Sequence, residues 1–237
     1  MPMQVRSPRR RPLAFVGRER RSKMATLNIM DVSKWQGTID WDKVKASGKV
    51  DGVILRVLGS KGGKPYVDPT FEVNYKACVE RGIPVGAYYY SAATLRSAAN
   101  IELALLRRTI LGKKFQLPIA VDTEHETQKR LGKQKLTDLV AYQLSMIESW
   151  GVYAMLYANL DFCLNYLYAG GAALKQYDLW LAAYRVNKTK PATDFGFGMW
   201  QHTSTDSVPG VSGNVDMSYA YKNYPAIIKK AGLELVK

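Results

Sequence analysis

The amino-acid sequence predicts a single α/β domain, an irregular parallel (β/α) barrel of the TIM-like kind, over residues 24–237. Eight short apolar runs recur along the chain, and helix-like segments separate most of them. The runs are continuously apolar, which is typical of parallel strands buried on both faces. A length of 237 residues suits one barrel, and neither an internal repeat nor an interior linker divides the chain.

The order of the elements follows from these patterns. The predicted strands lie at 27–33, 52–58, 84–91, 117–124, 153–159, 179–185, 197–203 and 215–219. Apolar spacing and closing glycines predict helices at 41–48, 69–82, 94–111, 136–151, 160–167 and 224–231. In the second of these helices, for example, Asp68-Pro69 marks the start and Gly82 the end. Because the later connections are short or rich in glycine and proline, we expect fewer than eight full helices.

A doubly wound open sheet is the structural alternative, since it produces the same alternation of strands and helices. Its usual phosphate-binding signal is missing, because no GxGxxG follows the first strand and no GxxxxGK[ST] occurs. The closed barrel therefore explains the strand count more economically.

The net charge of +14 is unevenly distributed. Residues 1–23 contain seven Arg and Lys23 against Glu19, a net of +7, and read as a basic, disordered leader or a cloning remnant. The alternative is an arm that binds polyanions weakly; no specific nucleic acid is expected. The apolar stretch 12–17 is too brief for a signal peptide, so the export route stays open. No run of about 18 apolar residues predicts a membrane-spanning helix.

Two carboxylates end the fourth predicted strand, in the run Leu117-Pro-Ile-Ala-Val-Asp-Thr-Glu124. Asp122 and Glu124 are two residues apart, so on an extended strand both side chains point to one face. Repulsion and desolvation separate the pKa values of such a pair into an acid and a base. The alternative is a solvated turn or a helix N-terminus.

Two further acidic residues are predicted at the same mouth of the barrel. Asp31 ends the first strand and Asp216 lies in the eighth, which barrel closure places beside the first. A single buried Asp is usually explained by a local hydrogen bond or salt bridge. Four carboxylates from three strands predict a catalytic site instead.

Aromatic side chains mark the same strand ends, in a chain with fifteen Tyr and five Trp. Flat rings beside carboxylates suit sugars, which offer apolar faces for stacking and hydroxyls for hydrogen bonding, although large rings are often simply core. Trp35 and Trp41 are weaker candidates than the tyrosines at the strand ends. Arg56, in the second strand, is expected to pair with carboxylates and keep a neighbouring Asp ionised. The predicted substrate contacts are Tyr88, Tyr90, Tyr157, Trp180, Tyr184, Gln201 and Arg56.

Other chemistries lack their signals in this sequence. The two histidines, His125 and His202, have no metal-binding spacing, so no metal and no cofactor is expected. No GxSxG elbow occurs, and Cys78 and Cys163 lack a neighbouring His. Both cysteines are expected to be free and buried.

Taken in order, several motifs resemble the family 25 glycoside hydrolases, the Chalaropsis-type lysozymes. The resemblance covers about residues 27–222. It depends on Met30-Asp-Val-Ser-Lys-Trp-Gln-Gly37, Ile39-Asp-Trp-Asp-Lys-Val44, Gly86-Ala-Tyr-Tyr-Tyr90, Leu117-Pro-Ile-Ala-Val-Asp-Thr-Glu124, Leu179-Trp-Leu-Ala-Ala-Tyr184, Met199-Trp-Gln201 and Gly213-Asn-Val-Asp216.

This resemblance implies an irregular β/α barrel and an N-acetylmuramidase, acting outside the cell on the peptidoglycan of bacterial walls. It implies cleavage of the β-1,4 bond between N-acetylmuramic acid and N-acetylglucosamine, with retention of configuration. Glu124 matches the acid/base, and Asp122 would assist from the other side of the sugar. Asp31 and Asp216 match the family's remaining acidic positions and would tune Glu124 or hold substrate or water. We expect a monomer.

Two routes to retention remain open: attack by a carboxylate, or attack by the substrate's own N-acetyl group with an Asp orienting it. We favour the second, because Asp122 and Glu124 leave one strand side by side. The sequence departs from the family at Tyr88-Tyr-Tyr90, where many relatives have His-Phe after the first Tyr, and at Arg56-Val-Leu58, where an acidic loop often follows. The basic leader has no counterpart in the family, and no cell-wall-binding repeats are recognisable.

Two other functional classes compete with this interpretation. A barrel of the same ancestry could bind glycans without cutting them, although such lectins usually lose the acid that Glu124 represents. The basic leader could instead bind nucleic acid, in which case binding would be salt-sensitive and would depend on residues 1–23.

Overall fold

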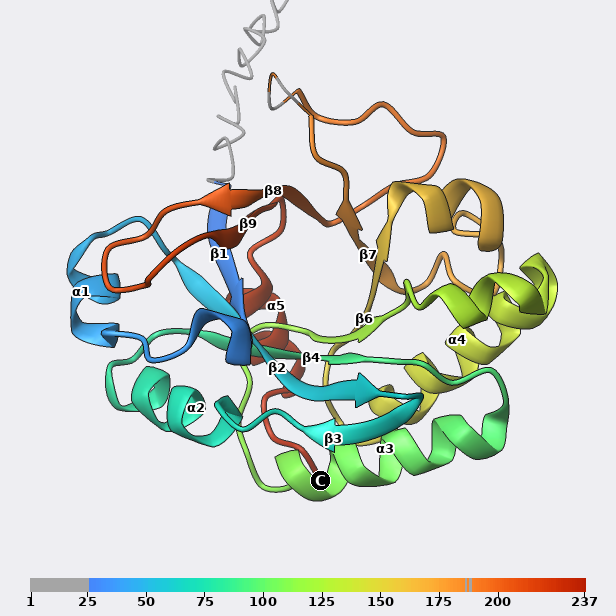
Figure 1. The fold of residues 1–237 in the computed structure, drawn as a ribbon, viewed down its shortest axis with the longest axis horizontal. Helices are drawn as coiled ribbons and strands as arrows, with labels where there is room; N and C mark the ends of the chain where they lie inside the picture. The colour runs from blue at the N-terminus through green and yellow to red at the C-terminus, as the bar shows by residue number, and fades with distance from the viewer. Residues whose placement is uncertain (1–25, 186, 188) are drawn as a thin grey trace, which may run out of the picture.

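Nine strands form one sheet that closes on itself in a computed structural model describing residues 26–185, 187 and 189–237 (Figure 1). The strand order is β1-β9-β8-β7-β6-β5-β4-β2-β3, and an additional β1–β2 pairing closes eight of the strands into a barrel. The strands are β1 Leu27–Val32, β2 Gly52–Lys61, β3 Lys64–Val67, β4 Val85–Tyr90, β5 Ile119–Asp122, β6 Ala154–Asn159, β7 Asp178–Ala182, β8 Met199–Asp206 and β9 Val215–Ala220. The predicted irregular barrel is confirmed.

One strand contradicts the prediction of an entirely parallel barrel. From β1 through β2, β4, β5, β6 and β7 to β8 the neighbours are parallel, but β9 is antiparallel to both β8 and β1. The connection 207–214 is too short to hold the crossover that a parallel strand needs, so the chain turns back on itself. As a result, the beginning of β9 lies at the mouth where the parallel strands end.

The sequence prediction also missed β3, which forms a hairpin with β2. Gly62 and Gly63 make the turn with φ of 57° and 76°, the left-handed conformation that two-residue hairpin turns favour. β3 lies outside the closed barrel, because it pairs only with β2.

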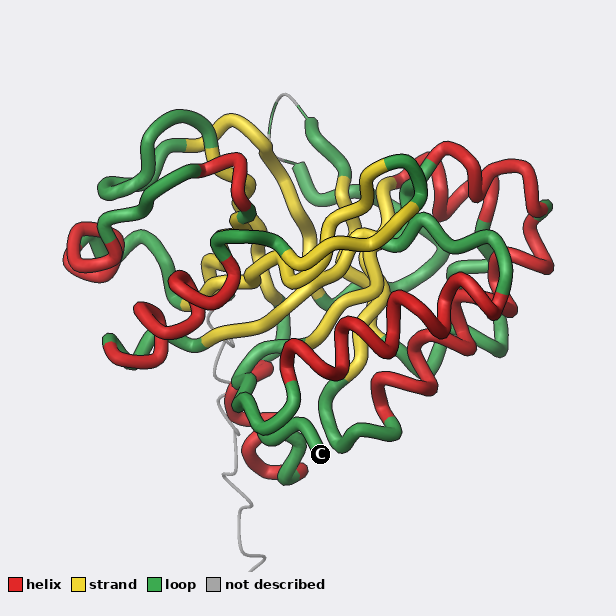
Figure 2. The backbone as a smooth tube through the Cα atoms, turned by 60° about the horizontal axis from the view of Figure 1, so that its bottom comes forward, coloured by secondary structure: helices red, strands yellow, loops and turns green. Residues whose placement is uncertain are grey.

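Helices surround the strands, which occupy the centre of the molecule (Figure 2). The α-helices are α1 Trp41–Ala46, α2 Phe71–Glu80, α3 Arg96–Ile110, α4 Lys133–Glu148 and α5 Tyr224–Ala231. Three short helical turns are η1 Lys34–Gln36, η2 Glu126–Leu131 and η3 Phe162–Tyr166, the last with π geometry. As expected, the described residues contain fewer than eight full helices.

The core has two parts, on the outside and the inside of the barrel wall. Alternate residues of each strand pack outward against the helices, as Val53 and Leu55 do on β2. The residues between them fill the interior, where Ile29, Ile54 and Ala120 pack together. The inside positions near the mouth are polar. The strands that carry these polar side chains are buried on both faces of the barrel wall.

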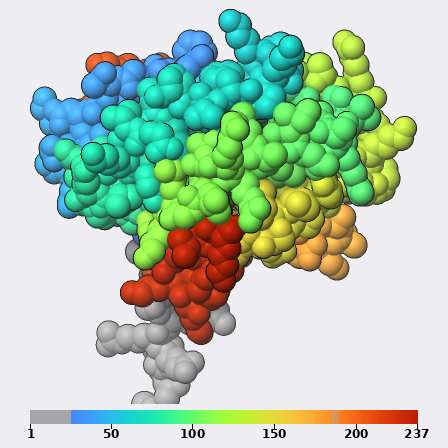
Figure 3. Space-filling view, turned by 90° about the horizontal axis from the view of Figure 1, so that it is seen from below, coloured from blue at the N-terminus to red at the C-terminus, as the bar shows by residue number. Residues whose placement is uncertain are grey.

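Helix α5 packs against the interior core at the end of the barrel opposite the mouth. Tyr224 and Ile228 belong to the same buried cluster as Ile29 and Trp180. In Figure 3, this C-terminal segment (red) forms part of the surface beside the segments coloured green and yellow. The mouth is therefore the open end of the barrel.

Three further expectations concern the chain as a whole. Cys78 and Cys163 are free and buried, as predicted, and burial raises the pKa of each thiol to about 12. Within the described ranges, no helix is long and apolar enough to cross a membrane. The predicted basic leader, 1–23, and the predicted domain start at 24 lie outside the described residues.

Candidate active site

A cavity of about 230 Å³ occupies the mouth of the barrel. Its lining brings together all four carboxylates that the sequence singled out, together with five of the seven predicted substrate contacts. The lining residues are Asp31, Tyr88, Asp122, Glu124, Tyr157, Trp180, Tyr184, Gln201 and Asp216. Tyr90 and Arg56 are not among them.

Asp31 and Asp216 are direct neighbours across the β1–β9 pairing. In an antiparallel ladder, paired Cα atoms lie about 4.5–5.5 Å apart and both side chains point to the same face. Burial first, and then the charge of Asp216, raises the pKa of Asp31 well above its usual value. Burial, followed by the charge of Glu124, raises the pKa of Asp216 to about 6. Ionising both members of this pair is therefore costly.

Asp122 is the last residue of β5, and its side chain points into the barrel. It is buried, and its Oδ1 atom has no hydrogen-bond partner among the described residues. Burial is the main cause that raises the pKa of Asp122; Glu124 and Asp31 raise it further, whereas Arg56 lowers it. A buried carboxylate oxygen without a protein donor is unusual in a native protein, and this one faces a cavity, so it is available to accept a hydrogen bond from a ligand.

Glu124 follows β5 and lies partly buried at the edge of the cavity. Its Oε2 atom accepts a hydrogen bond of 3.3 Å from Nδ2 of Asn159. Burial raises the pKa of Glu124, and the hydrogen bond from Asn159 opposes that shift. A carboxyl group held in this way keeps its proton to a higher pH than an exposed one, as a general acid must.

Sequence reasoning missed Asn159. This residue ends β6, two positions after Tyr157, so the two side chains share a face. Its Oδ1 atom accepts a hydrogen bond of 3.0 Å from the backbone N–H of Phe162, which leaves the amide nitrogen to face Glu124. The alternation that selected Tyr157 would also have selected Asn159.

Gln201 connects two tyrosines to Asp31. Its Oε1 atom accepts hydrogen bonds from the hydroxyls of Tyr157, at 2.9 Å, and Tyr184, at 2.8 Å. Its Nε2 atom donates to Oδ2 of Asp31 at 2.9 Å. Two hydroxyl donors on one oxygen fix the amide orientation, so the N–H must face the carboxylate. Gln201 was predicted as a substrate contact. Its side chain lines the cavity but is buried, and it holds Asp31 through this hydrogen bond.

The aromatic residues have different places in the cavity. Trp180 is almost fully buried as its floor, with its ring edge-on to that of Tyr157 at 4.8 Å between centroids. The indole N–H of Trp180 donates to Ser218 Oγ at 2.9 Å. Tyr184 is 55% exposed at the rim, so its ring is accessible to a ligand. Tyr90 lies outside the lining, next to His125.

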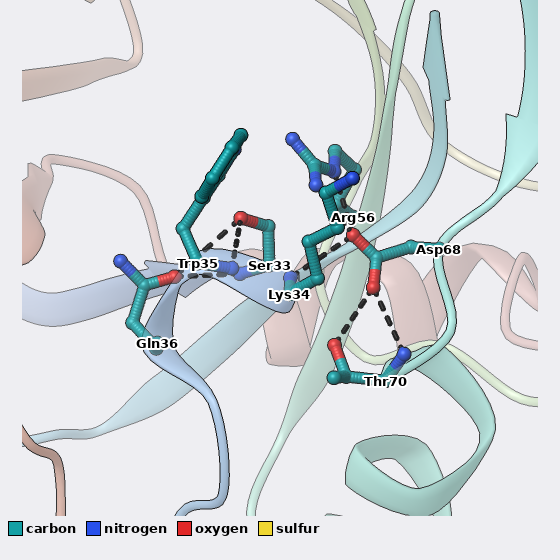
Figure 4. Close-up of polar contacts among 7 residues, drawn as sticks. All are labelled: Ser33, Lys34, Trp35, Gln36, Arg56, Asp68 and Thr70. Carbon is teal, nitrogen blue, oxygen red and sulfur yellow. Dashed lines mark hydrogen bonds and ion pairs between the residues drawn. The ribbon is translucent and has the colours of Figure 1, made fainter.

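Arg56 forms its ion pair with Asp68, a residue that the sequence analysis did not assign to the site. Nε and Nη2 of Arg56 both lie 2.7 Å from Asp68 Oδ2 (Figure 4). Burial alone would raise the pKa of Asp68, but hydrogen bonds from Thr70, Lys34 and Arg56 lower it. The charge of Arg56 still acts on the cavity, because it lowers the pKa of Asp122.

A second cavity, of about 530 Å³, adjoins the first. Both are lined by Glu124, Tyr157 and Tyr184, and the second continues past Asn159 to Arg185. Glu124 therefore lies where the two cavities meet. Among the described residues, no group of three His, Cys, Asp or Glu side chains is arranged to hold a metal ion.

Comparisons with known proteins match most of this chain. A family model described as "Glycosyl hydrolases family 25" matches residues 30–211. The chain is 29% identical over 197 residues to "Uncharacterized protein YegX" of Escherichia coli strain K12, covering 81% of this chain and 69% of YegX. It is 26% identical over 188 residues to the "Autolytic lysozyme" of Clostridium acetobutylicum, covering 79% of this chain and 54% of that protein.

Two solved structures share the fold. The CTP1L endolysin superposes with a TM-score of 0.73 at 26% identity, covering 86% of this chain and 70% of that one. A bacterial lysozyme from Streptomyces coelicolor superposes with a TM-score of 0.74 at 20% identity, covering 88% of this chain and 99% of that one.

Proposed function

We propose that this chain, which belongs to glycosyl hydrolases family 25, is a lysozyme that hydrolyses the β-1,4 bond between N-acetylmuramic acid and N-acetylglucosamine in bacterial peptidoglycan. The similar proteins named as lysozymes and an endolysin support action on the cell wall. The observation that carries the proposal is the position of Glu124, a carboxyl group of raised pKa where two cavities meet.

Glu124 is suited to be the general acid. A glycosidase acid must reach the oxygen that joins two sugars, so it lies between the sites for the two rings. The carboxylate cavity would hold the sugar that is attacked, and the cavity towards Arg185 would hold the leaving sugar. Glu124 gives its proton to the leaving oxygen as the bond from the anomeric carbon breaks. It then takes a proton from the attacking water.

Asp122 is suited to orient the N-acetyl group of the attacked sugar. Its Oδ1 atom lacks a donor, and the amide N–H of an acetamido group would supply one. The acetyl oxygen would bond to the anomeric carbon and later be displaced by water, so two inversions give net retention. The competing route, in which a carboxylate attacks, requires carboxyl groups about 5–5.5 Å apart. A glycosyl ester trapped on Asp122 or Asp216 would overturn our preference.

Asp31 and Asp216 would supply negative charge beside the forming oxocarbenium ion. Because the two repel each other, one ionises more readily; this is Asp216, whose charge raises the pKa of Asp31 despite the hydrogen bond that Asp31 accepts from Gln201. Tyr184 at the rim would contact the sugar face. Each of these roles is part of the proposal.

The test is the substitution Glu124→Gln, which keeps the shape and removes the proton. We expect release of reducing muramic-acid ends from purified peptidoglycan to fall by at least 10³-fold, in the range found for general acids and bases, about 10²–10⁴. Glu126→Gln, two residues away and exposed, is the matched control and should retain activity. Mass spectrometry of the digest distinguishes muramidase products from those of glucosaminidases and amidases. Near-normal turnover by the Glu124→Gln variant would contradict the assignment.

A glycan-binding barrel without activity is the second candidate. The complete carboxylate set in the cavity argues against it, since a binding protein has no use for an acid of raised pKa. Tight binding of peptidoglycan by the unsubstituted chain with no released product would favour it. We also propose action outside the cell and a monomer; sedimentation at several protein concentrations would test the latter.

A further inference from the structure

Trp35 is an exposed aromatic side chain at the mouth of the barrel. It is 77% exposed, the most of any large hydrophobic side chain in the described part of the chain, whereas Trp41 is only 4% exposed. Trp35 lies in η1, four residues after Asp31. The sequence ranked both tryptophans alike, but only Trp41 is core. An exposed ring at the mouth offers a flat apolar face on which a sugar can stack.

Hydrogen bonds hold the turn that carries Trp35 in one conformation. The backbone N–H of Ser33 donates to Oε1 of Gln36 at 2.9 Å, and the N–H of Trp35 donates to Ser33 Oγ at 3.3 Å. The N–H of Lys34 donates to Asp68 at 3.0 Å, below the ring in Figure 4. Because this turn is already ordered, a ligand that stacks on Trp35 does not have to order it.

The ammonium group of Lys34 lies between two aromatic rings. Its Nζ is 5.1 Å from the centroid of Trp35 and 4.8 Å from that of Tyr66. No ion pair joins Lys34 to a carboxylate among the described residues, so its three N–H donors face no anion there. The Tyr66 ring lies over Gly59, where an added Cβ would fall 2.5 Å from the Tyr66 hydroxyl. Glycine at 59 therefore makes room for this arrangement.

The group Lys34, Trp35 and Tyr66, here called the aromatic platform, adjoins the carboxylate cavity. Gln36 Nε2 donates to the backbone oxygen of Asn214, two residues before Asp216, at 3.4 Å. The platform lies at β1 and the β2–β3 hairpin, whereas the cavity containing Arg185 lies at β6 and β7. In the barrel order these strand pairs are opposite each other. The second cavity, the carboxylate cavity and the platform therefore follow one another across the mouth.

We propose that the aromatic platform is a further subsite for an anionic glycan: Trp35 stacks on a sugar on the non-leaving side of the cleaved bond, and Lys34 binds a carboxylate of the peptide that muramic acid carries. The inference rests on the proposed function, because it takes its direction from Glu124. The leaving sugar lies on the side of the second cavity, so the platform contacts the part of the chain that receives the new reducing end. Lys34 then makes the enzyme prefer peptide-bearing glycan to bare glycan.

The test measures binding with Lys34→Met, which keeps the unbranched side chain and removes the charge. Glu124→Gln is present in every protein, so that the glycan is not consumed. Lys61→Met is the charge-matched control, because Lys61 is exposed at the end of β2. The ligands are soluble peptidoglycan fragments and the same fragments with their carboxylates converted to amides. Calorimetry gives the dissociation constants.

We expect Lys34→Met to weaken binding of the native fragments about tenfold, since a hydrogen bond to a charged group contributes that much or more. Binding of the amidated fragments should change less than about twofold, and Lys61→Met should have no larger effect on either ligand. An equal loss on both ligands, or no loss on the native one, would overturn the proposal. Equal losses for Lys34→Met and Lys61→Met would reduce it to long-range attraction and overturn it too.

Trp35 provides an independent measurement. Trp35→Ala should weaken both native and amidated fragments alike, since stacking does not depend on charge, and Trp35→Phe should restore part of the loss. Unchanged binding by Trp35→Ala would refute the stacking role. The proposed function fails separately: if the chain with Glu124 intact releases no reducing ends, while Lys34→Met still weakens binding of the native fragments and not of the amidated ones, the platform stands and the hydrolase does not.

Discussion

Replacing Asp216 by Asn should stabilise the fold, even though Asp216 belongs to the proposed catalytic set. The pKa of Asp216 rises from 3.8 to about 6 in the folded protein, because burial and the charge of Glu124 disfavour its ionised form. A raised folded pKa means that the native state is favoured by protonation. The associated stability is fully present below about pH 4 and is lost as the pH rises through about 6.

The size of the effect follows from this shift. Two pKa units correspond to about 3 kcal/mol at pH 7, and linkage reduces that figure to about 0.5 kcal/mol at pH 4. Asp216 lines a cavity that opens to water, so solvent screening should lower the gain at pH 7 to about 1–2 kcal/mol. The uncharged Asn keeps the shape of the side chain and removes the penalty.

Urea denaturation at pH 7 and pH 4 measures the free energy of unfolding of both proteins. Asp216→Asn should be the more stable chain at pH 7, with little difference at pH 4. Asp194→Asn, at an exposed position, is the matched control and should change stability by less than about 0.5 kcal/mol. A gain as large at pH 4 as at pH 7, or a loss at pH 7, would refute the electrostatic reasoning.

Two other substitutions test how the carboxylates are held. Asn159→Ala removes the hydrogen bond that lowers the pKa of Glu124. The alkaline limb of the pH profile of kcat should therefore move to higher pH, while kcat falls about tenfold. An alkaline limb at an unchanged pH would count against the contact. Gln201→Leu removes the donor to Asp31 and the acceptor of two tyrosine hydroxyls, which should cost about 2–3 kcal/mol of unfolding free energy. Because Gln201 lowers the pKa of Asp31, the loss should grow as the pH rises through the raised pKa of Asp31, and urea denaturation showing a loss that shrinks with rising pH would contradict this role.

Most of the barrel was predictable from local patterns. Continuous apolar runs marked the barrel strands, because a strand covered on both faces needs apolar side chains in both directions. Alternation then placed Asp122 and Tyr157 on inward faces. The hairpin strand β3 was missed, since Lys64–Val67 is half polar and lies outside the barrel, where burial imposes no pattern on it.

Long-range pairing decided what the patterns could not. Asp216 was expected as the second residue of a parallel strand at 215–219. It is the second residue of β9, but β9 is antiparallel and pairs Asp216 with Asp31. Either direction of the strand gives the same apolar alternation, so the sequence of β9 does not reveal it. Arg56 was expected to pair with the catalytic carboxylates. Its ion pair is instead with Asp68, which directly follows β3.

By itself, the sequence determined that apolar strands carry Asp31, Asp122 and Glu124 to one end of a barrel, because side-chain alternation and strand-end chemistry are local properties. Tertiary structure alone decided three outcomes. It reversed β9, placed the amide of Asn159 next to Glu124, and left Trp35 exposed while it buried Trp41. Those outcomes depend on which segments pack together, and two tryptophans six residues apart carry no local signal of what will cover them.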